Sequence, residues 1–65
     1  MNVDKSIRLN KRGFIFHSTR KFAEAISAFT AAIQLNPNYA IAYFNRGETW
    51  FALREFEKGI VDYTR

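Results

Sequence analysis

The chain of 65 residues contains no cysteine, one proline, three glycines and one histidine. The absence of cysteine excludes a disulfide framework and a thiolate zinc site. So little proline and glycine argues against an all-β fold, which needs many turns. No apolar run approaches the roughly 20 residues of a membrane-spanning helix, and the N-terminal residues lack the apolar core of a signal peptide. We therefore expect a small α-helical protein of the cytoplasm that does not insert into membranes.

The chain is rich in aromatic and basic residues. Hydrophobic residues make up 48% of it and aromatic residues 17%, which excludes a disordered chain. Residues 1–39 carry the whole formal net charge of +4, because residues 40–65 contain as many acidic as basic side chains. Such a basic region can attract nucleic acid, acidic peptides or anionic lipid, or it can be a solvated helix face. A single domain of this size buries only about 60% of its unfolded surface, so its stability is marginal or comes from a partner.

Apolar residues recur at three- and four-residue steps along most of the chain, which predicts amphipathic helices. Polar residues at 19–21 and 54–55 and the strong breaker Asn36-Pro37-Asn38 interrupt this pattern. Pro37 suits the first residue of a helix, with Asn36 as its N-terminal cap. The predicted helices span residues 4–18, 22–35, 38–53 and 56–65.

An internal repeat becomes visible when the chain is shifted against itself by 34 residues. Residues 6–31 then face residues 40–65 without a gap, and seven pairs are identical. These pairs are Ile7/Ile41, Arg12/Arg46, Gly13/Gly47, Arg20/Arg54, Phe22/Phe56, Ile26/Ile60 and Thr30/Thr64. Each half therefore predicts the same unit, which is a helix, a short turn and a second helix.

The period and the residues within it resemble the tetratricopeptide repeat family. The first unit carries the pattern as Leu9, Gly13, Phe16, Ala25, Phe29, Ala32 and Pro37, and the second as Tyr43, Gly47, Trp50, Gly59 and Tyr63. The resemblance implies an all-α fold of two stacked antiparallel helical hairpins, as in a fragment of an α-solenoid. We expect a lead-in at residues 1–5, a first unit at 6–39 and an incomplete second unit at 40–65. The sequence leaves open whether the chain is part of a longer array.

The resemblance also explains residues that helix propensity does not favour. Gly13 and Gly47 lie inside predicted helices, where glycine costs about 1 kcal/mol relative to alanine, so we expect each to let a partner helix approach closely. The side chains expected to fill the space between paired helices are Phe16, Phe22 and Phe29, with Trp50, Phe56 and Tyr63 in the second unit. The family often has glycine where Arg20 and Arg54 stand, so a positive φ would strain these turns.

No arrangement of residues indicates catalysis. His17 is the single histidine, and the metalloprotease, serine-hydrolase and phosphate-loop motifs are absent from the sequence. We therefore expect no enzyme activity, no metal site and no cofactor.

In the family that the chain resembles, the first helix of each unit lines a concave groove that binds a peptide. The register places in this groove Ile7, Asn10, Lys11, Phe14, His17, Ser18, Ile41, Phe44, Asn45, Glu48, Phe51 and Ala52. Five of them are large apolar side chains that the core of a unit does not explain, so either a peptide or a neighbouring unit or copy covers them. The carboxylate clamp of some family members is matched only at Asn45, which favours an apolar peptide, with Lys11 near an acidic neighbour.

Self-association is the alternative function. The end of the second unit is predicted to expose an apolar face formed by Trp50, Phe56, Ile60 and Tyr63. Two copies can cover such a face as a dimer or by exchanging helices. Nucleic acid is a weaker candidate, because Arg12 and Arg46 recur at one repeat position and no nucleic-acid-binding motif is present. We therefore expect the partner to be another protein, a peptide or a second copy.

Overall fold

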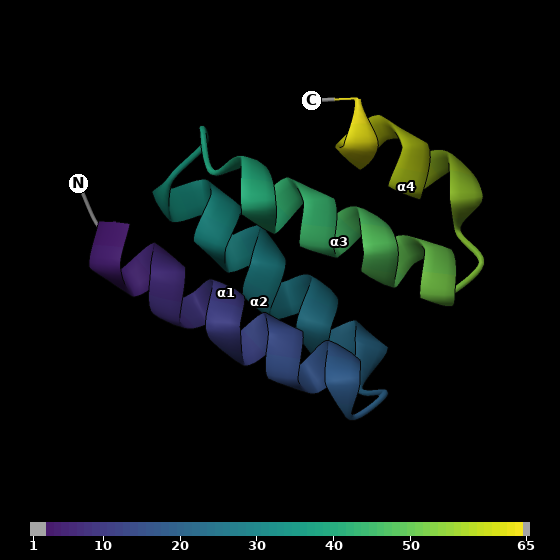
Figure 1. Cartoon of the computed structure of the whole chain (residues 1–65), viewed down its shortest axis with the longest axis horizontal. Coiled ribbons are helices and arrows are strands. Elements are labelled where there is room, and N and C mark those ends of the chain that lie inside the picture. Colours follow the sequence, from purple (N-terminus) through teal and green to yellow (C-terminus); the bar gives the residue numbers. More distant parts are fainter. Residues whose placement is uncertain (1–2, 65) are drawn as a thin grey trace.

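The computed structural model describes residues 3–64, which form four α-helices. The helices are α1 (Val3–Ser18), α2 (Phe22–Leu35), α3 (Ala40–Ala52) and α4 (Phe56–Tyr63). They lie side by side in chain order, with α1 at one edge and α4 at the other (Figure 1). α1 packs on α2, α3 packs on α4, and the two hairpins meet where α3 packs on α2 and touches α1. The predicted all-α fold of stacked helical hairpins is confirmed.

The helix bounds agree with the prediction to within one residue, except at the start of the third helix and at the end of the fourth, where Thr64 lies beyond the end of α4. Asn36 does not cap that helix; it is the C-cap of α2, whose last helical hydrogen bond runs from the Asn36 N–H to the Ala32 carbonyl at 3.0 Å. Pro37 lies in the following turn, which the Tyr39 N–H closes on the Asn36 carbonyl at 3.0 Å, and α3 begins only at Ala40. The φ of proline suits a turn as well as a first helical residue, which is why the sequence pattern placed this start too early. The last position of the predicted fourth helix, residue 65, lies outside the described residues.

The turns within the two hairpins have the same strained geometry. Arg20 and Arg54 have φ of 64° and 63°, in the left-handed region that favours glycine. At the end of α1, the Arg20 N–H donates to the His17 carbonyl and the Lys21 N–H to the Phe16 carbonyl, the bond pattern of a Schellman motif. The equivalent two bonds end α3. Both arginines therefore have the positive φ that was expected to strain these turns.

Two glycines allow the paired helices to approach closely. A Cβ at Gly13 would lie 2.6 Å from the Phe29 ring, which comes from α2. A Cβ at Gly47 would lie 2.8 Å from the Tyr63 ring and 3.2 Å from the Gly59 carbonyl oxygen of α4. A Cβ essentially never lies within 3.0 Å of a ring carbon, so the prediction of close helix approach is confirmed for both hairpins.

The apolar core lies mainly along α2, because α2 is packed between α1 and α3. Its buried side chains are Ala25, Ala28, Phe29, Ala32 and Ile33, joined by Ala42 of α3. Phe56 and Tyr63 contact Phe51 of α3, as expected for side chains between paired helices, but they do not form a comparably buried interior, since they are 50% and 41% exposed. Within the described residues, no helix packs on the outer side of α4, so its aromatic side chains stay about half exposed although they contact α3.

Candidate protein-interaction surface

A hollow of about 220 Å³ lies where α1 and α3 pass over α2. Its lining consists of Phe14, His17, Phe29, Phe44, Asn45 and Glu48. Phe14 and Phe44, from different helices, are 57% and 55% exposed, whereas Phe29 of α2 is fully buried. The hollow therefore presents two large apolar side chains to solvent beside polar groups of α1 and α3.

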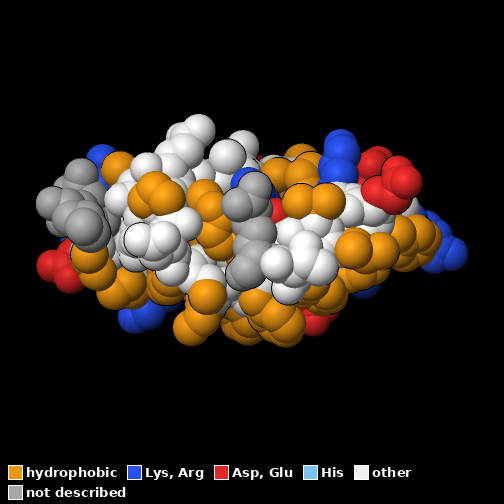
Figure 2. Space-filling model, turned by 90° about the horizontal axis from the view of Figure 1, so that it is seen from above, with side chains coloured by type: hydrophobic (Ala, Val, Ile, Leu, Met, Phe, Trp, Pro, Cys, Tyr) orange, Lys and Arg blue, Asp and Glu red, His pale blue; other side chains and the backbone are white. Residues whose placement is uncertain are grey.

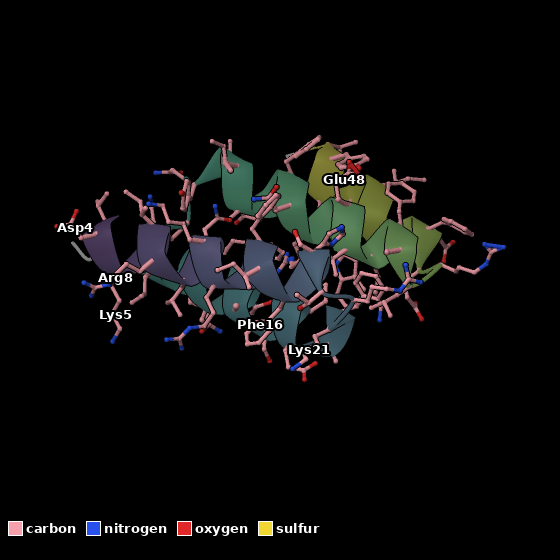
Figure 3. The ribbon with its side chains drawn as sticks, turned by 60° about the horizontal axis from the view of Figure 1, so that its bottom comes forward. Asp4, Lys5, Arg8, Phe16, Lys21 and Glu48 are labelled. Carbon is pink, nitrogen blue, oxygen red and sulfur yellow. The ribbon has the colours of Figure 1, made fainter. Side chains whose placement is uncertain are left out.

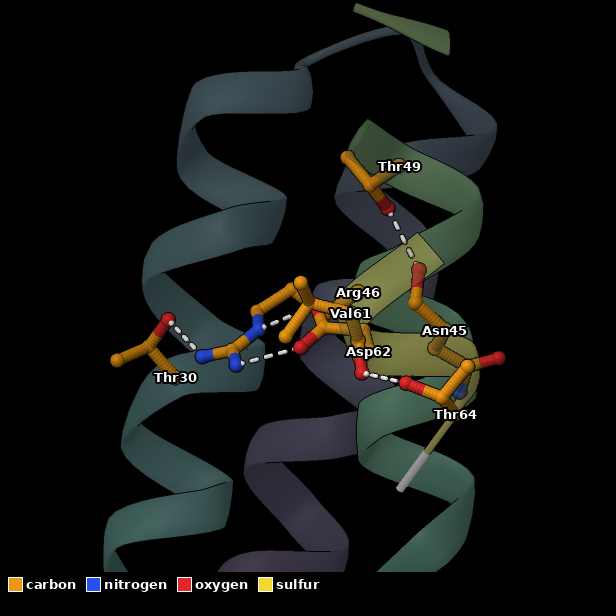
Figure 4. Close-up of polar contacts among 7 residues, drawn as sticks. All are labelled: Thr30, Asn45, Arg46, Thr49, Val61, Asp62 and Thr64. Carbon is orange, nitrogen blue, oxygen red and sulfur yellow. Dashed lines mark hydrogen bonds and ion pairs between the residues drawn. The ribbon is translucent and has the colours of Figure 1, made fainter. Parts of the chain in front are cut away.

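Hydrogen bonds between α1 and α3 hold the polar side of this hollow. The Asn45 side-chain nitrogen donates to the Asn10 side-chain oxygen at 3.1 Å, and His17 Nδ1 lies 2.8 Å from Thr49 Oγ1. The Thr49 hydroxyl donates its hydrogen to the Asn45 carbonyl at 2.9 Å (Figure 4). Because that hydrogen is already used, Thr49 Oγ1 must accept from His17, which places a proton on His17 Nδ1. The histidine therefore orients α1 against α3.

A chain of aromatic contacts between α3 and α4 leads from the hollow to the first residue of α4. The Phe44 ring stacks on Tyr63 with centroids 5.3 Å apart, Tyr63 contacts Phe51 at 5.0 Å, and Phe51 contacts Phe56 at 5.8 Å. Burial raises the pKa of Tyr63, and the Glu48 carboxylate beside it raises that pKa further. The apolar surface of α3 thus continues onto α4 without a polar break in this row of rings.

Arg46 joins three helices at the back of the second hairpin. Its Nε and its second terminal nitrogen each donate to the Asp62 carboxylate of α4 at 2.8 Å, and its first terminal nitrogen donates to Thr30 Oγ1 of α2 at 3.1 Å (Figure 4). The hydrogen bond to Asp62 raises the pKa of Arg46, against the opposing effect of burial. Sequence reasoning noticed the recurrence of Arg46 but missed Asp62, since an acidic residue in an amphipathic helix is usually exposed.

The structure brings together only part of the predicted groove set. Phe14, His17, Phe44, Asn45 and Glu48 share the hollow, whereas its lining does not include the remaining predicted residues. Those are Ile7, Lys11 and Ile41, which are exposed, Phe51, which is half-buried in the aromatic row, Asn10, which is buried, and exposed Ser18 and Ala52.

The predicted self-association residues separate into two places. Phe56, Ile60 and Tyr63 form one exposed stripe at helical spacing along α4. Trp50 lies elsewhere, in a hollow of about 280 Å³ with Lys58, whose ammonium nitrogen is 4.7 Å from the indole centroid. Hydrophobic side chains occur across the face seen in Figure 2, between acidic and basic side chains at its ends.

The outer surface of the first hairpin is partly basic. A hollow of about 450 Å³ between α1 and α2 includes Leu9, Arg12 and Phe16 in its lining. Figure 3 shows Lys5 and Arg8 near the N-terminal end of α1, away from Glu48. Over residues 3–64, neither a cluster of possible metal ligands nor a helix long and apolar enough to cross a membrane is found.

Comparison with known proteins agrees with this architecture. The family model described as TPR repeat matches residues 13–53, which is more than half of the chain. The chain belongs to the tetratricopeptide repeat family. It is similar to the DnaJ homolog subfamily C member 7 homolog of Schizosaccharomyces pombe, at 42% identity over 52 residues, and to human tetratricopeptide repeat protein 17, at 30% identity over 59 residues. No solved structure matches it.

Membership of the tetratricopeptide repeat family supports a role in binding proteins. The family generally mediates protein–protein interaction, and its members are generally scaffolds rather than enzymes. The two matches cover 77% and 91% of this chain but only 11% and 5% of the relatives, so the chain spans a small part of each. The groove, the self-association face and the unit boundaries stay predictions.

Proposed function

We propose that this protein binds an apolar peptide segment of another protein in the hollow between α1 and α3. The observation that supports this function is the convergence of Phe14 and Phe44, both more than half exposed, on one concave surface above Phe29. Apolar surface gathered in a pocket with a few polar groups is typical of binding sites.

The chemistry of the rim defines the peptide further. A side chain with an aromatic or branched apolar group fits a hollow of about 220 Å³ between the two phenyl rings. Glu48 and Lys11 are exposed on α3 and α1, so a carboxylate and an ammonium are available to a peptide that lies along the hollow. The hydrogen bonds of His17 and Asn45 position the helices in advance, which limits the conformational cost of binding.

A pair of neighbouring substitutions tests this function. Peptides are selected with the wild-type protein from a random-peptide phage library, and the affinity of a labelled selected peptide is measured by fluorescence polarisation. Phe14→Ser removes an apolar wall of the hollow and is expected to weaken binding by about tenfold or more. Ile15→Ser removes a comparably exposed apolar side chain that does not line the hollow, and is expected to leave affinity unchanged.

The proposal is wrong if the selected peptides lack apolar residues, or if Phe14→Ser and Ile15→Ser bind them equally well. Circular dichroism of each variant separates a loss of binding from a loss of fold. Because both residues are more than half exposed, the helical signal is expected to be retained in both variants.

A further inference from the structure

The junction between the two hairpins contains three polar side-chain contacts. Asn10 meets Asn45, His17 meets Thr49, and Thr30 meets Arg46. The first member of each pair belongs to the first hairpin, and the second member belongs to α3. Through these contacts the first hairpin packs against the first helix of the second.

When each junction residue is replaced by its equivalent 34 positions earlier or later in the chain, the equivalents lie on the two outer surfaces of the molecule. The leading face is the outer surface of α1 that holds Lys11, Arg12, Ile15 and Phe16. The trailing face is the surface of α3 and α4 that holds Phe44, Phe51, Ile60 and Thr64. Phe44, Phe51 and Thr64 of the trailing face are equivalent to the three residues with which the first hairpin contacts α3. Lys11, Ile15 and Arg12 of the leading face are equivalent to their three partners on α3. Ile60 and Phe16 lie one helical turn from Thr64 and Arg12, on the same faces.

The first projected contact is chemically identical to the one in the junction. Thr30 and Arg46 correspond to Thr64 and Arg12, so a threonine again faces an arginine. The Thr64 hydroxyl donates to the Val61 carbonyl at 3.0 Å, which leaves its oxygen able to accept (Figure 4). Over residues 3–64, Arg12 has no hydrogen-bond or ion-pair partner, and the residue equivalent to Asp62 is Ala28.

The second projected contact changes from polar to apolar on both sides. His17 and Thr49 correspond to Phe51 and Ile15. Ile15 is 61% exposed on α1 and lines none of the hollows described above. A phenyl ring opposite this isoleucine would remove both apolar surfaces from water.

The third projected contact and the adjoining hollow are complementary in charge. Asn10 and Asn45 correspond to Phe44 and Lys11, which places an ammonium opposite an aromatic ring. Phe14 and Asn45, which line one hollow, correspond to Glu48 and Lys11, an acidic and a basic residue. Each of the three projected contacts therefore joins suitable partners, although two of them differ in chemistry from the junction.

We infer that the trailing face of one copy of this chain docks onto the leading face of a second copy, head to tail, in the geometry by which the first hairpin receives α3. The inference goes beyond the proposed peptide groove and does not depend on it. Since the two docked surfaces differ, each copy keeps a free face at either end, and the association is open-ended rather than a closed dimer.

The first measurement is the weight-average mass of the protein over a concentration series, by sedimentation or light scattering. We expect it to rise steadily from the 7.6 kDa of one chain past that of two, without a plateau. A mass that stays at one chain throughout overturns the inference, even if the protein binds peptides. A plateau at two chains overturns it as well, because that indicates a symmetric dimer.

Two charged variants distinguish head-to-tail docking from other modes. Ile15→Glu blocks only the leading face and Ile60→Glu only the trailing face, so each alone is expected to weaken association by about tenfold or more. Mixed together, they are expected to form a one-to-one complex and nothing larger, since each supplies the intact face that the other lacks. A mixture that stays monomeric overturns the proposed pairing.

Val61→Glu is the matched control. Val61 neighbours Ile60 on α4 and is similarly exposed, but it lines the hollow beside Trp50 and Lys58 rather than the trailing face. This variant adds the same charge to the same helix and is expected to associate as the wild type does. If it abolishes association to the same degree as Ile60→Glu, the docking surface is not the trailing face.

Discussion

The two hairpins share one repeat pattern yet differ in how their second helices are buried. Phe29 of α2 is fully buried, whereas its equivalent Tyr63 of α4 is 41% exposed. Ile26 is half-buried, whereas the identical residue Ile60 is 53% exposed. The difference arises because α3 covers α2, while no described helix covers α4. Equivalent positions in a repeat therefore contribute equally to stability only when a neighbouring helix covers both of them.

The largest expected effect comes from truncating the two equivalent aromatic residues. Phe29→Ala removes a fully buried ring and is expected to cost about 3–5 kcal/mol. Tyr63→Ala is expected to cost only about 1 kcal/mol, because the side chain is partly hydrated already. Urea unfolding followed by circular dichroism measures both values. Equal losses would show that α4 is as well packed as α2.

The next largest loss of stability is expected at the Arg46–Asp62 ion pair, which has no equivalent in the first hairpin over residues 3–64. Asp62→Ala leaves the partly buried Arg46 without its carboxylate, and is expected to destabilise the fold by about 2–3 kcal/mol. Arg12→Ala changes the equivalent of Arg46, which has no carboxylate partner over residues 3–64, and is expected to shift the urea midpoint very little. If both variants unfold at the wild-type urea concentration, the pair contributes nothing measurable.

The two close-approach glycines are expected to differ in the same direction as the two aromatic residues. Gly13→Ala forces a methyl group against the buried Phe29 ring, at a net cost of about 1–2 kcal/mol after the gain in helix propensity. Gly47→Ala is expected to cost less, because the Tyr63 ring can move towards solvent. Thermal unfolding of both variants checks the order, and a larger loss at Gly47 would contradict it.

Replacing the arginines in the strained turns is expected to stabilise both hairpins slightly. Glycine relieves a left-handed conformation that costs other residues roughly 1–2 kcal/mol, but it also loosens the unfolded chain. We expect Arg54→Gly to gain about 0.5–1 kcal/mol. Arg20→Gly is expected to gain less, because the Arg20 guanidinium also lies 5.8 Å from the Phe22 ring centroid. A higher melting temperature checks each gain.

The smallest effect concerns alkaline pH and involves only the second hairpin. The pKa of Tyr63 is raised by burial and by Glu48, so folding favours the neutral phenol. Its contribution to stability is therefore present below the ordinary tyrosine pKa of about 10 and is lost as the pH rises through the raised value. Tyr63→Phe is expected to flatten this part of the alkaline decline in the urea midpoint. An unchanged decline would assign it to other groups.

Much of the fold could be predicted from sequence because its signals are local or periodic. The spacing of apolar residues indicated four helices, and the 34-residue period paired Gly13 with Gly47 and Arg20 with Arg54 before any contact was known. The start of α3 was predicted wrongly, because proline suits both a turn and a first helical turn. The candidate groove was predicted in part, since Phe14 and Phe44 do share a hollow, whereas Ile7 and Ile41 do not line it.

The sequence by itself determined the number of helices, the repeat register and the glycines at which helices approach, because these follow from spacing along one chain. Only the tertiary structure decided that Asp62 and Thr49 are buried, that Trp50 lies apart from Phe56, and that the α4 aromatic side chains stay about half exposed. The physical reason is that burial and hydrogen bonding depend on which neighbour covers a side chain. In this molecule, α3 supplies that neighbour for α2, and no described helix supplies it for α4.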